Sequence, residues 1–168
     1  MAINSTMGLK KIYVAPVGEN GAMPSTGWLD LGDVYQESCT LKDSDPETTV
    51  FKSETSSKKI TVVGEIDTTV ELTLMDPDLA QLSRYFGGEV SGSGTNRTWT
   101  RPKKLDYVEW AVWIQPIDGL FVGCPVARII PKLEISYNSK GICLMPMTIE
   151  FQADLQVAEG MTAPTISE

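Results

Sequence analysis

The centre of the chain alternates between apolar and polar residues. Every second position from 66 to 74 is apolar or a threonine: Ile66, Thr68, Val70, Leu72 and Leu74. The gaps hold polar residues, among them Asp67 and Glu71. This two-residue period predicts a long strand, from about residue 60 to residue 75, with one face in a core and one face in water.

The period changes within three residues after this strand. Asp76 and Asp78 suit a helix start, because aspartate caps the first turn and its charge favours the positive end of the helix dipole. Pro77 fits the first helical position. Leu79, Leu82 and Phe86 then follow at helical spacing, and Gly87-Gly88 can supply the positive φ that ends a helix. The pattern predicts one short α-helix over about 76–86.

A second alternating stretch lies near the end of the chain. Its apolar positions are Met147, Ile149, Phe151, Ala153, Leu155 and Val157. Polar residues, including Glu150 and Asp154, stand between them without a miss. The stretch predicts a single strand from 147 to 157 with one dry face and one polar face.

The remaining patterns predict more strands. Short apolar runs occur at 11–17, 27–35, 37–41, 120–130 and 132–137, and the run 107–116 is apolar on both sides. The latter predicts a strand covered on both faces, by the fold alone or by the fold and a partner. The polar stretch 42–59, interrupted only by Val50 and Phe51, predicts a flexible loop or an extended hairpin.

Many strands around one central helix predict a mainly β fold. The fold class that fits best is an antiparallel β-sandwich or barrel with one short flanking α-helix. We expect an N-terminal arm over 1–9, a single domain over 10–157 that contains the long loop 42–59, and a C-terminal tail over 158–168.

Composition is that of an ordinary globular domain. The chain has 168 residues, of which 42% are hydrophobic and 21% charged, enough for one domain with a sizeable core. No apolar run approaches the ~20 residues of a membrane-spanning helix, and the first residues lack the apolar segment of a signal peptide. We therefore expect folding in a cytoplasm and no membrane insertion. The odd set Cys39, Cys124 and Cys143 is expected to stay reduced.

The chain contains no histidine. That absence removes Ser-His-Asp and Cys-His catalysis and histidine-ligated metals, and no phosphate-binding loop or nucleophile elbow is present. We therefore predict a protein that is not an enzyme and that uses no cofactor and no metal. A net charge of −8 also argues against specific binding to duplex DNA, which needs a basic surface.

Charges are distributed unevenly along the chain. Segments 60–83 and 141–168 contain acidic residues and no basic residue. Basic residues gather in the long loop and in segment 97–104. The simplest interpretation is a solvated acidic face; the functional one is an acidic sheet face beside loops that meet acidic neighbours.

The strand-to-helix unit 70–88 resembles the tail tube proteins of long-tailed bacteriophages. The resemblance rests on the motif LTLMDPDLAQL followed by Gly87-Gly88, on the polar loop ahead of it and on the order of the later strands. It implies a tail-tube-like fold whose copies form hexameric rings. The rings would stack into the tail tube of a virion, assembled in the bacterial host cytoplasm around a tape-measure protein and bounded by tail-end proteins.

The resemblance also implies where contacts lie. Genome DNA would pass through the tube without specific binding. The long loop would contact the next ring through its charged residues: Asp45, Glu47, Lys52, Glu54, Lys58 and Lys59. Four carboxylates of the two alternating strands are expected to line the channel, where they would repel DNA phosphates: Asp67, Glu71, Glu150 and Asp154.

Two alternative functions remain open on the sequence. The first is the tube protein of a contractile tail or of a type VI secretion system, which shares the fold. The second is a monomeric ligand-binding β-sandwich that uses Trp99, Trp110 and Trp113 as a binding platform. Hollow filaments seen by electron microscopy would distinguish a tube protein from the monomeric module.

Overall fold

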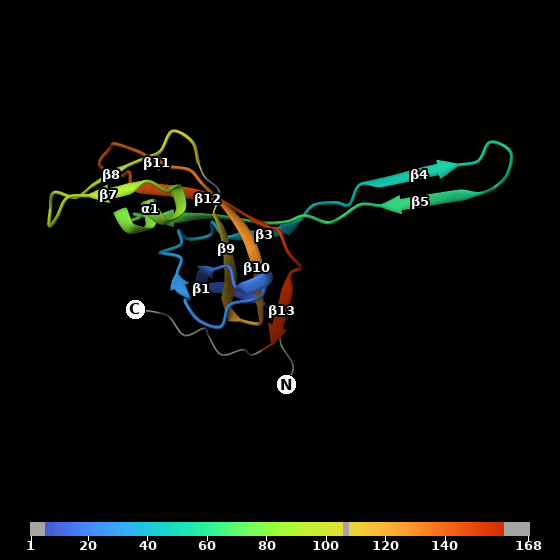
Figure 1. Cartoon of the computed structure of the whole chain (residues 1–168), viewed down its shortest axis with the longest axis horizontal. Helices are drawn as coiled ribbons and strands as arrows, with labels where there is room; N and C mark the ends of the chain where they lie inside the picture. The colour runs from blue at the N-terminus through green and yellow to red at the C-terminus, as the bar shows by residue number, and fades with distance from the viewer. Residues whose placement is uncertain (1–5, 106–107, 160–168) are drawn as a thin grey trace.

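The structure, a computed structural model, describes residues 6–105 and 108–159 and is built mainly of strands (Figure 1). The strands in chain order are β1 Met7–Pro16, β2 Leu29–Asp30, β3 Thr40–Asp43, β4 Thr48–Lys52, β5 Lys59–Val63, β6 Thr68–Met75, β7 Glu89–Ser91, β8 Thr98–Thr100, β9 Glu109–Asp118, β10 Leu120–Pro131, β11 Glu134–Ile135, β12 Cys143–Phe151 and β13 Gln156–Glu159. The α-helix α1 spans Leu79–Phe86, and a short 3-10 turn spans Glu19–Gly21. The predicted fold class, mainly β with one short helix, is confirmed.

One antiparallel sheet of nine strands organises the chain. Its main path runs β2-β1-β9-β10-β12-β6-β3, with β11 paired to β12 and β13 paired to β10. Two separate two-stranded ribbons, β4-β5 and β7-β8, complete the strand pairing of the described residues. Every pairing is antiparallel.

The sheet curls around its main core. Strands from both ends of the path contribute to one buried cluster, with Ile12 and Val14 from β1 and Val70, Leu72 and Leu74 from β6. The helix α1 covers this cluster with Leu82, Tyr85 and Phe86. The Tyr85 hydroxyl donates a hydrogen bond of 3.1 Å to the Leu31 carbonyl, and burial raises the pKa of this phenol. The sheet is therefore an incompletely closed barrel with the helix over its dry side.

Strands β1 and β9 are covered on both faces, as the apolar run 107–116 predicts. On one face Val112 joins the main core. On the other face Ala111 and Trp113 join Tyr13 and Phe121 in a second buried cluster. The rings of Trp113 and Phe121 stack at a centroid distance of 5.9 Å. The fold itself therefore covers both faces of the strand. Tyr107 of the predicted strand lies outside the described residues.

The predicted helix is present but begins later than expected. Asp76 has a positive φ of 43°, and its N–H donates to the Cys143 carbonyl at 2.8 Å, so it still belongs to the sheet edge. The N-cap is Asp78, whose carboxylate accepts from the Gln81 N–H at 2.8 Å while the Gln81 side chain accepts from the Asp78 N–H. This reciprocal capping box starts the helix at Leu79. The predicted ending is confirmed by Gly87, which has a φ of 80°.

The predicted long strand 60–75 is wrong as a single element. It is split into β5 and β6 by residues 64–67, although both halves keep one register with the preceding segment, β4 opposite β5 and β3 opposite β6. The core positions of β6 are confirmed, whereas Ile66 is 58% exposed in the connection. Hydrogen bonds between Ser44 and Asp67 fix that connection, with Ser44 N–H donating to the Asp67 carbonyl at 2.8 Å. Only β6 has a second neighbour, β12, and the local alternation cannot report where that neighbour ends.

The predicted strand 147–157 is also interrupted. Strand β12 ends at Phe151, and β13 starts at Gln156 along the same edge of β10. Between the pairs Ala127–Phe151 and Gly123–Gln156, the segment from β12 to β13 advances by one residue more than strand β10 does. Strand β10 has a matching register shift against β9 between Cys124 and Ala127, so Val157 stays on the face of Val122 and Ile114 but is 52% exposed there, whereas Ala158 on the other face packs against the second core.

Several other boundaries differ from the sequence-based expectations. Strand β1 already begins at Met7, so the end of the expected arm belongs to the sheet. The predicted strand 27–35 contains β2 and isolated bridges at Trp28 and Val34, the latter to Leu74. Strand β13 includes the first two residues of the expected tail 158–168, whose remainder lies outside the described residues.

Replacing Asp78 with alanine is expected to lower the free energy of unfolding by about 1 kcal/mol, because the helix loses its capping carboxylate. Asp78→Asn, which keeps a capping oxygen, should stay close to the parent. Urea denaturation followed by tryptophan fluorescence measures both. Equal losses in the two variants would contradict the capping role.

Candidate functional site

The hairpin formed by β4 and β5 projects away from the rest of the molecule (Figure 1). Its strands pair only with each other, and every residue of both strands is exposed. Nine residues separate Gly64 at its base from Thr55 at its tip, which at ~3.3 Å a residue is a reach of about 30 Å. The structure therefore selects the extended hairpin over the flexible loop for much of segment 42–59.

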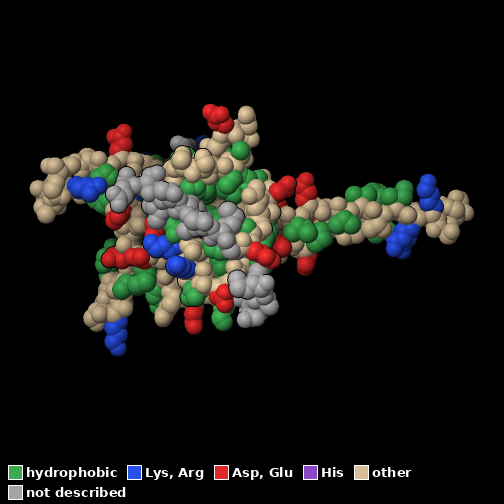
Figure 2. All heavy atoms as spheres, turned by 90° about the horizontal axis from the view of Figure 1, so that it is seen from below, with side chains coloured by type: hydrophobic (Ala, Val, Ile, Leu, Met, Phe, Trp, Pro, Cys, Tyr) green, Lys and Arg blue, Asp and Glu red, His purple; other side chains and the backbone are tan. Residues whose placement is uncertain are grey.

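The larger apolar side chains of the hairpin lie on one face that no other described residue covers, while the opposite face carries Val50 and Val63. Cross-strand partners share a face, so the pairs Phe51–Ile60 and Thr49–Val62 lie together. Phe51 is 59%, Ile60 50% and Val62 51% exposed. Figure 2 shows hydrophobic side chains along this projection. An isolated two-stranded ribbon is only marginally stable in water, so this surface suits burial against another molecule.

The residues predicted to contact a neighbouring ring lie at both ends of the hairpin. Lys52 and Lys59 are directly opposite each other on the face away from Phe51, and Glu54 and Lys58 belong to the connecting turn. Like charges in opposite positions repel, so the distal end attracts an acidic partner. Asp45 and Glu47 lie instead at the base, where the Gly64 N–H donates to the Glu47 carbonyl at 2.7 Å.

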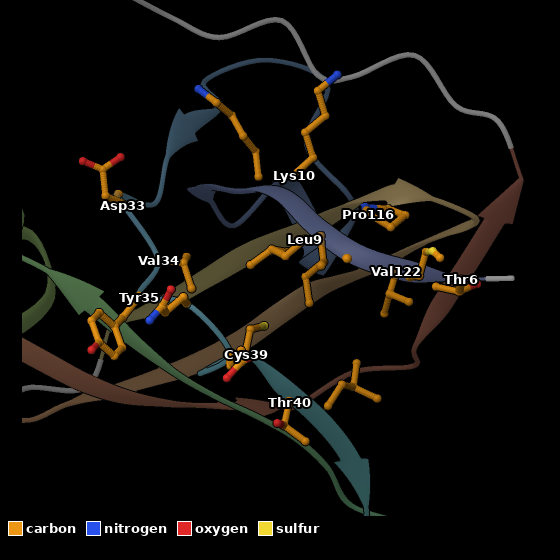
Figure 3. Close-up of a pocket in the computed structure, with 18 of the residues that line it drawn as sticks. Thr6, Leu9, Lys10, Asp33, Val34, Tyr35, Cys39, Thr40, Pro116 and Val122 are labelled. Atoms are coloured by element: carbon orange, nitrogen blue, oxygen red, sulfur yellow. The ribbon is translucent and has the colours of Figure 1, made fainter.

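A groove lies where the curled sheet fails to close, between the first half of β1 and the start of β3 (Figure 3). Its volume is about 870 Å³. Among the described residues, no strand pairs with the outer edge of β1 before Ile12 or with the outer edge of β3. We call this feature the β1–β3 groove.

The β1–β3 groove exposes the edge of the main core. Leu9, Val34, Cys39 and Ile114 pack against the buried cluster, yet they line the groove and remain half-buried. Burial raises the pKa of the Cys39 thiol. This wall is apolar, and residues 6–105 and 108–159 do not cover it fully.

Charged side chains form the rim of the β1–β3 groove. Acids outnumber bases there, with Asp30, Asp33 and Glu37 against Lys10 and Lys11. The Lys11 ammonium donates to an Asp30 carboxylate oxygen at 2.7 Å, and this hydrogen bond raises the pKa of Lys11. The rim is net negative. Sequence reasoning missed this groove because its walls come from segments far apart in the chain.

The carboxylates predicted to line a channel are only partly brought together. Glu71 on β6 and Glu150 on β12 belong to the polar face of adjacent strands, opposite the buried positions Val70 and Ile149. Asp67 and Asp154 were expected on the same strand faces. Instead they lie in the connections that precede β6 and follow β12.

The polar face of the sheet is mixed in charge. Register places Lys42 of β3, Thr69 of β6, Glu150 of β12 and Arg128 of β10 in one cross-strand row. Arg128 Nε lies 3.9 Å from a Glu150 carboxylate oxygen, with both side chains partly exposed. The sequence segments of β6 and β12 contain no bases, but neighbouring strands supply them. The contact between Arg128 and Glu150 was not predicted because the two residues are far apart in the sequence.

The tryptophans proposed as a ligand platform pack into the domain. Trp113 is only 5% exposed. Trp110 meets Tyr85 edge-on at a centroid distance of 6.3 Å, and the Trp99 indole N–H donates to the Gly87 carbonyl at 2.9 Å. These indoles serve the core and do not form an exposed platform.

Chemistry-bearing groups are sparse in the part of the chain that the structure describes. Residues 6–105 and 108–159 contain no group of three or more acidic, cysteine or histidine side chains arranged to hold a metal ion. Cys39, Cys124 and Cys143 are all free thiols. No described helix is long and apolar enough to cross a membrane.

Comparisons with known proteins return structural matches only. No protein-family model matches the chain, and no curated protein matches its sequence. A chain from the cryo-EM structure of the anti-feeding prophage (AFP) baseplate, 6-fold symmetrised, has a TM-score of 0.50 at 6% identity, covering 94% of this chain and 97% of that one. A chain from the tail of an empty GTA particle with C6 symmetry has a TM-score of 0.49 at 15% identity, covering 89% and 95%. The chain shares its fold with the baseplate subunit.

Removing the hairpin is expected to leave the rest of the fold intact. Replacing residues 48–63 with Gly-Gly should change the free energy of unfolding by no more than about 0.5 kcal/mol, because no other described strand pairs with β4 or β5. Trp99→Ala, which removes a half-buried indole, should cost about 2 kcal/mol as a positive control. Urea denaturation compares the variants. A large loss on hairpin removal would show that the hairpin packs on the domain.

Proposed function

We propose that this protein is a structural subunit of a phage-type tail that polymerises as stacked hexameric rings into the tail tube. The observation that carries the proposal is the exposed β4–β5 hairpin, whose apolar face is not covered by any other described residue. The fold shared with a chain of a 6-fold symmetrised baseplate supports it. In this role the protein is a component of the virion and performs no catalysis.

Unpaired sheet edges support ring formation. The outer edges of β3 and of the first half of β1 have no partner among the described strands. Exposed edges invite pairing with other chains, and assembly with neighbouring copies would remove them from solvent. Six copies would form each ring of the assembly, with a tape-measure protein inside during assembly and tail-end proteins at the boundaries.

The β4–β5 hairpin is suited to connect one ring to the next. Its reach of about 30 Å is comparable to the diameter of a domain of this size. Lys52, Lys58, Lys59 and Glu54 would meet the neighbour at its distal end, whereas Asp45 and Glu47 would contact it near the base. Docking would stabilise a hairpin that is marginal alone.

The polar face that contains Glu71 and Glu150 would line the channel, with Asp67 and Asp154 at its ends. Carboxylates repel DNA phosphates, and the pairing of Arg128 with Glu150 would limit the cation available to bind them. DNA could then pass without specific binding. The channel wall would therefore prevent DNA binding through its arrangement of charges alone.

Purified protein at high concentration is expected to form hollow filaments, seen by electron microscopy. Charge reversal by Lys58→Glu with Lys59→Glu should raise the concentration required for filaments about tenfold or more, because the distal hairpin loses its attraction to an acidic neighbour.

The matched control is Lys103→Glu with Lys104→Glu, which makes the same change in net charge at exposed positions outside the hairpin. It should assemble like the parent. Rings that do not stack would favour a baseplate-type subunit, and a protein that stays monomeric would contradict the proposal.

A cryo-EM structure of the filament is expected to place Glu71 and Glu150 on the inner wall. Glu71→Lys with Glu150→Lys should preserve the subunit fold, because both side chains lie on the polar face, but should increase retention of duplex DNA by the filaments. Filter binding at low salt measures that retention. Carboxylates on the outer surface of the filament would refute the channel assignment.

A further inference from the structure

We infer that the β1–β3 groove is the docking site for the β4–β5 hairpin of a second copy of this chain. The inference rests on the proposed function and deepens it, because it names both partners of one contact between subunits. It joins two surfaces that the described residues leave open: the apolar face of the hairpin and the core edge in the groove.

The two surfaces match in apolar character. Phe51, Ile60 and Val62 form a stripe on one face of the hairpin. In the groove, Leu9 and Val34 leave part of the core edge open to solvent. Contact between them would remove apolar area from water on both partners, which is the main favourable term in protein association.

The two surfaces also match in charge. The distal hairpin is net positive, since Lys52, Lys58 and Lys59 accompany a single acid, Glu54. The rim of the groove is net negative through Asp30, Asp33 and Glu37, which outnumber its lysines. Opposite potentials favour this orientation and disfavour contact between two hairpin tips.

The shape of the groove suits a strand. It is bordered by the outer edges of β3 and of the first half of β1, which pair with no described strand, and the outer edges of β4 and β5 also pair with none. A strand that enters the gap can form backbone hydrogen bonds with an exposed edge while its side chains fill the apolar wall. Figure 3 shows the opening between β1, which carries Leu9, and the segment of Cys39 and Thr40.

The occupant must come from another copy. Strand β3 leads from the groove at Cys39 toward the hairpin base at Ser44, and the hairpin continues away from the body of the molecule (Figure 1). The apolar stripe of the same chain therefore faces solvent far from its own groove. Another subunit can present the stripe without any rearrangement of the fold.

Cys39 provides a direct test, because it is a free thiol in the wall of the groove. Val62→Cys places a second thiol on the apolar face of the hairpin, and Thr61→Cys places one on the opposite face as the matched control. Both variants carry Cys143→Ser to remove the other half-buried thiol. Oxidation with copper phenanthroline is followed by non-reducing electrophoresis.

Assembled Val62→Cys protein is expected to give covalent dimers and longer ladders. A disulfide requires Cα atoms within about 7 Å, so the yield should exceed that of Thr61→Cys by about tenfold or more. Adding Cys39→Ser should abolish the ladder. Equal yields from the two hairpin positions, or a ladder that persists without Cys39, would overturn the inference.

Hydrogen exchange on the unmodified protein gives an independent readout. On assembly, amides of residues 7–11 and 40–43 should gain protection together with those of β4 and β5. If filaments form and the hairpin gains protection while the groove does not, the hairpin binds elsewhere and this inference fails alone. If no assembly forms at all, the proposed function fails with it.

Discussion

A sheet that curls around a core must either pair its two end strands or leave their backbone groups to another partner. In this protein the outer edges of the first half of β1 and of β3 have no partner among the described strands, and the core edge at Leu9 and Val34 is left partly open between them. The rest of the domain is arranged around that gap. The helix α1 covers the dry side through Phe86, and the hydrogen bond from Tyr85 to the Leu31 carbonyl ties the helix to the segment that crosses toward β6.

The hydrophobic patterns correctly predicted elements whose neighbours in the fold stay the same along their length. Alternation placed Val70, Leu72 and Leu74 in the core, and Gly87 ended the helix as expected. Prediction failed wherever a neighbour changed. Along 60–75 only β6 gains β12 as a second neighbour, and 147–157 slips by one residue along β10. Both events depend on strands distant in sequence. The two-residue period continues unchanged across each interruption and therefore does not predict it.

The candidate site was predictable only in its simplest parts. The polar composition of 42–59 indicated an exposed segment, but the choice between loop and hairpin needed the register that sets Phe51 against Ile60. Acidic segments were visible along the chain, whereas the contact between Arg128 and Glu150 was not, because strand order brings it together. The β1–β3 groove had no sequence signature at all. Charge and patterning describe each strand, and topology decides which strands share a surface.

The hairpin and the groove are different surfaces, so a contact between them joins unlike patches. Such heterologous contacts do not close on themselves along the direction of stacking, and they give an assembly two unlike ends. One end would present free hairpins and the other would present empty grooves. Growth would then be directional, and each end would require its own terminating protein: one that offers a groove without a hairpin, and one that fills the groove without extending the chain of contacts.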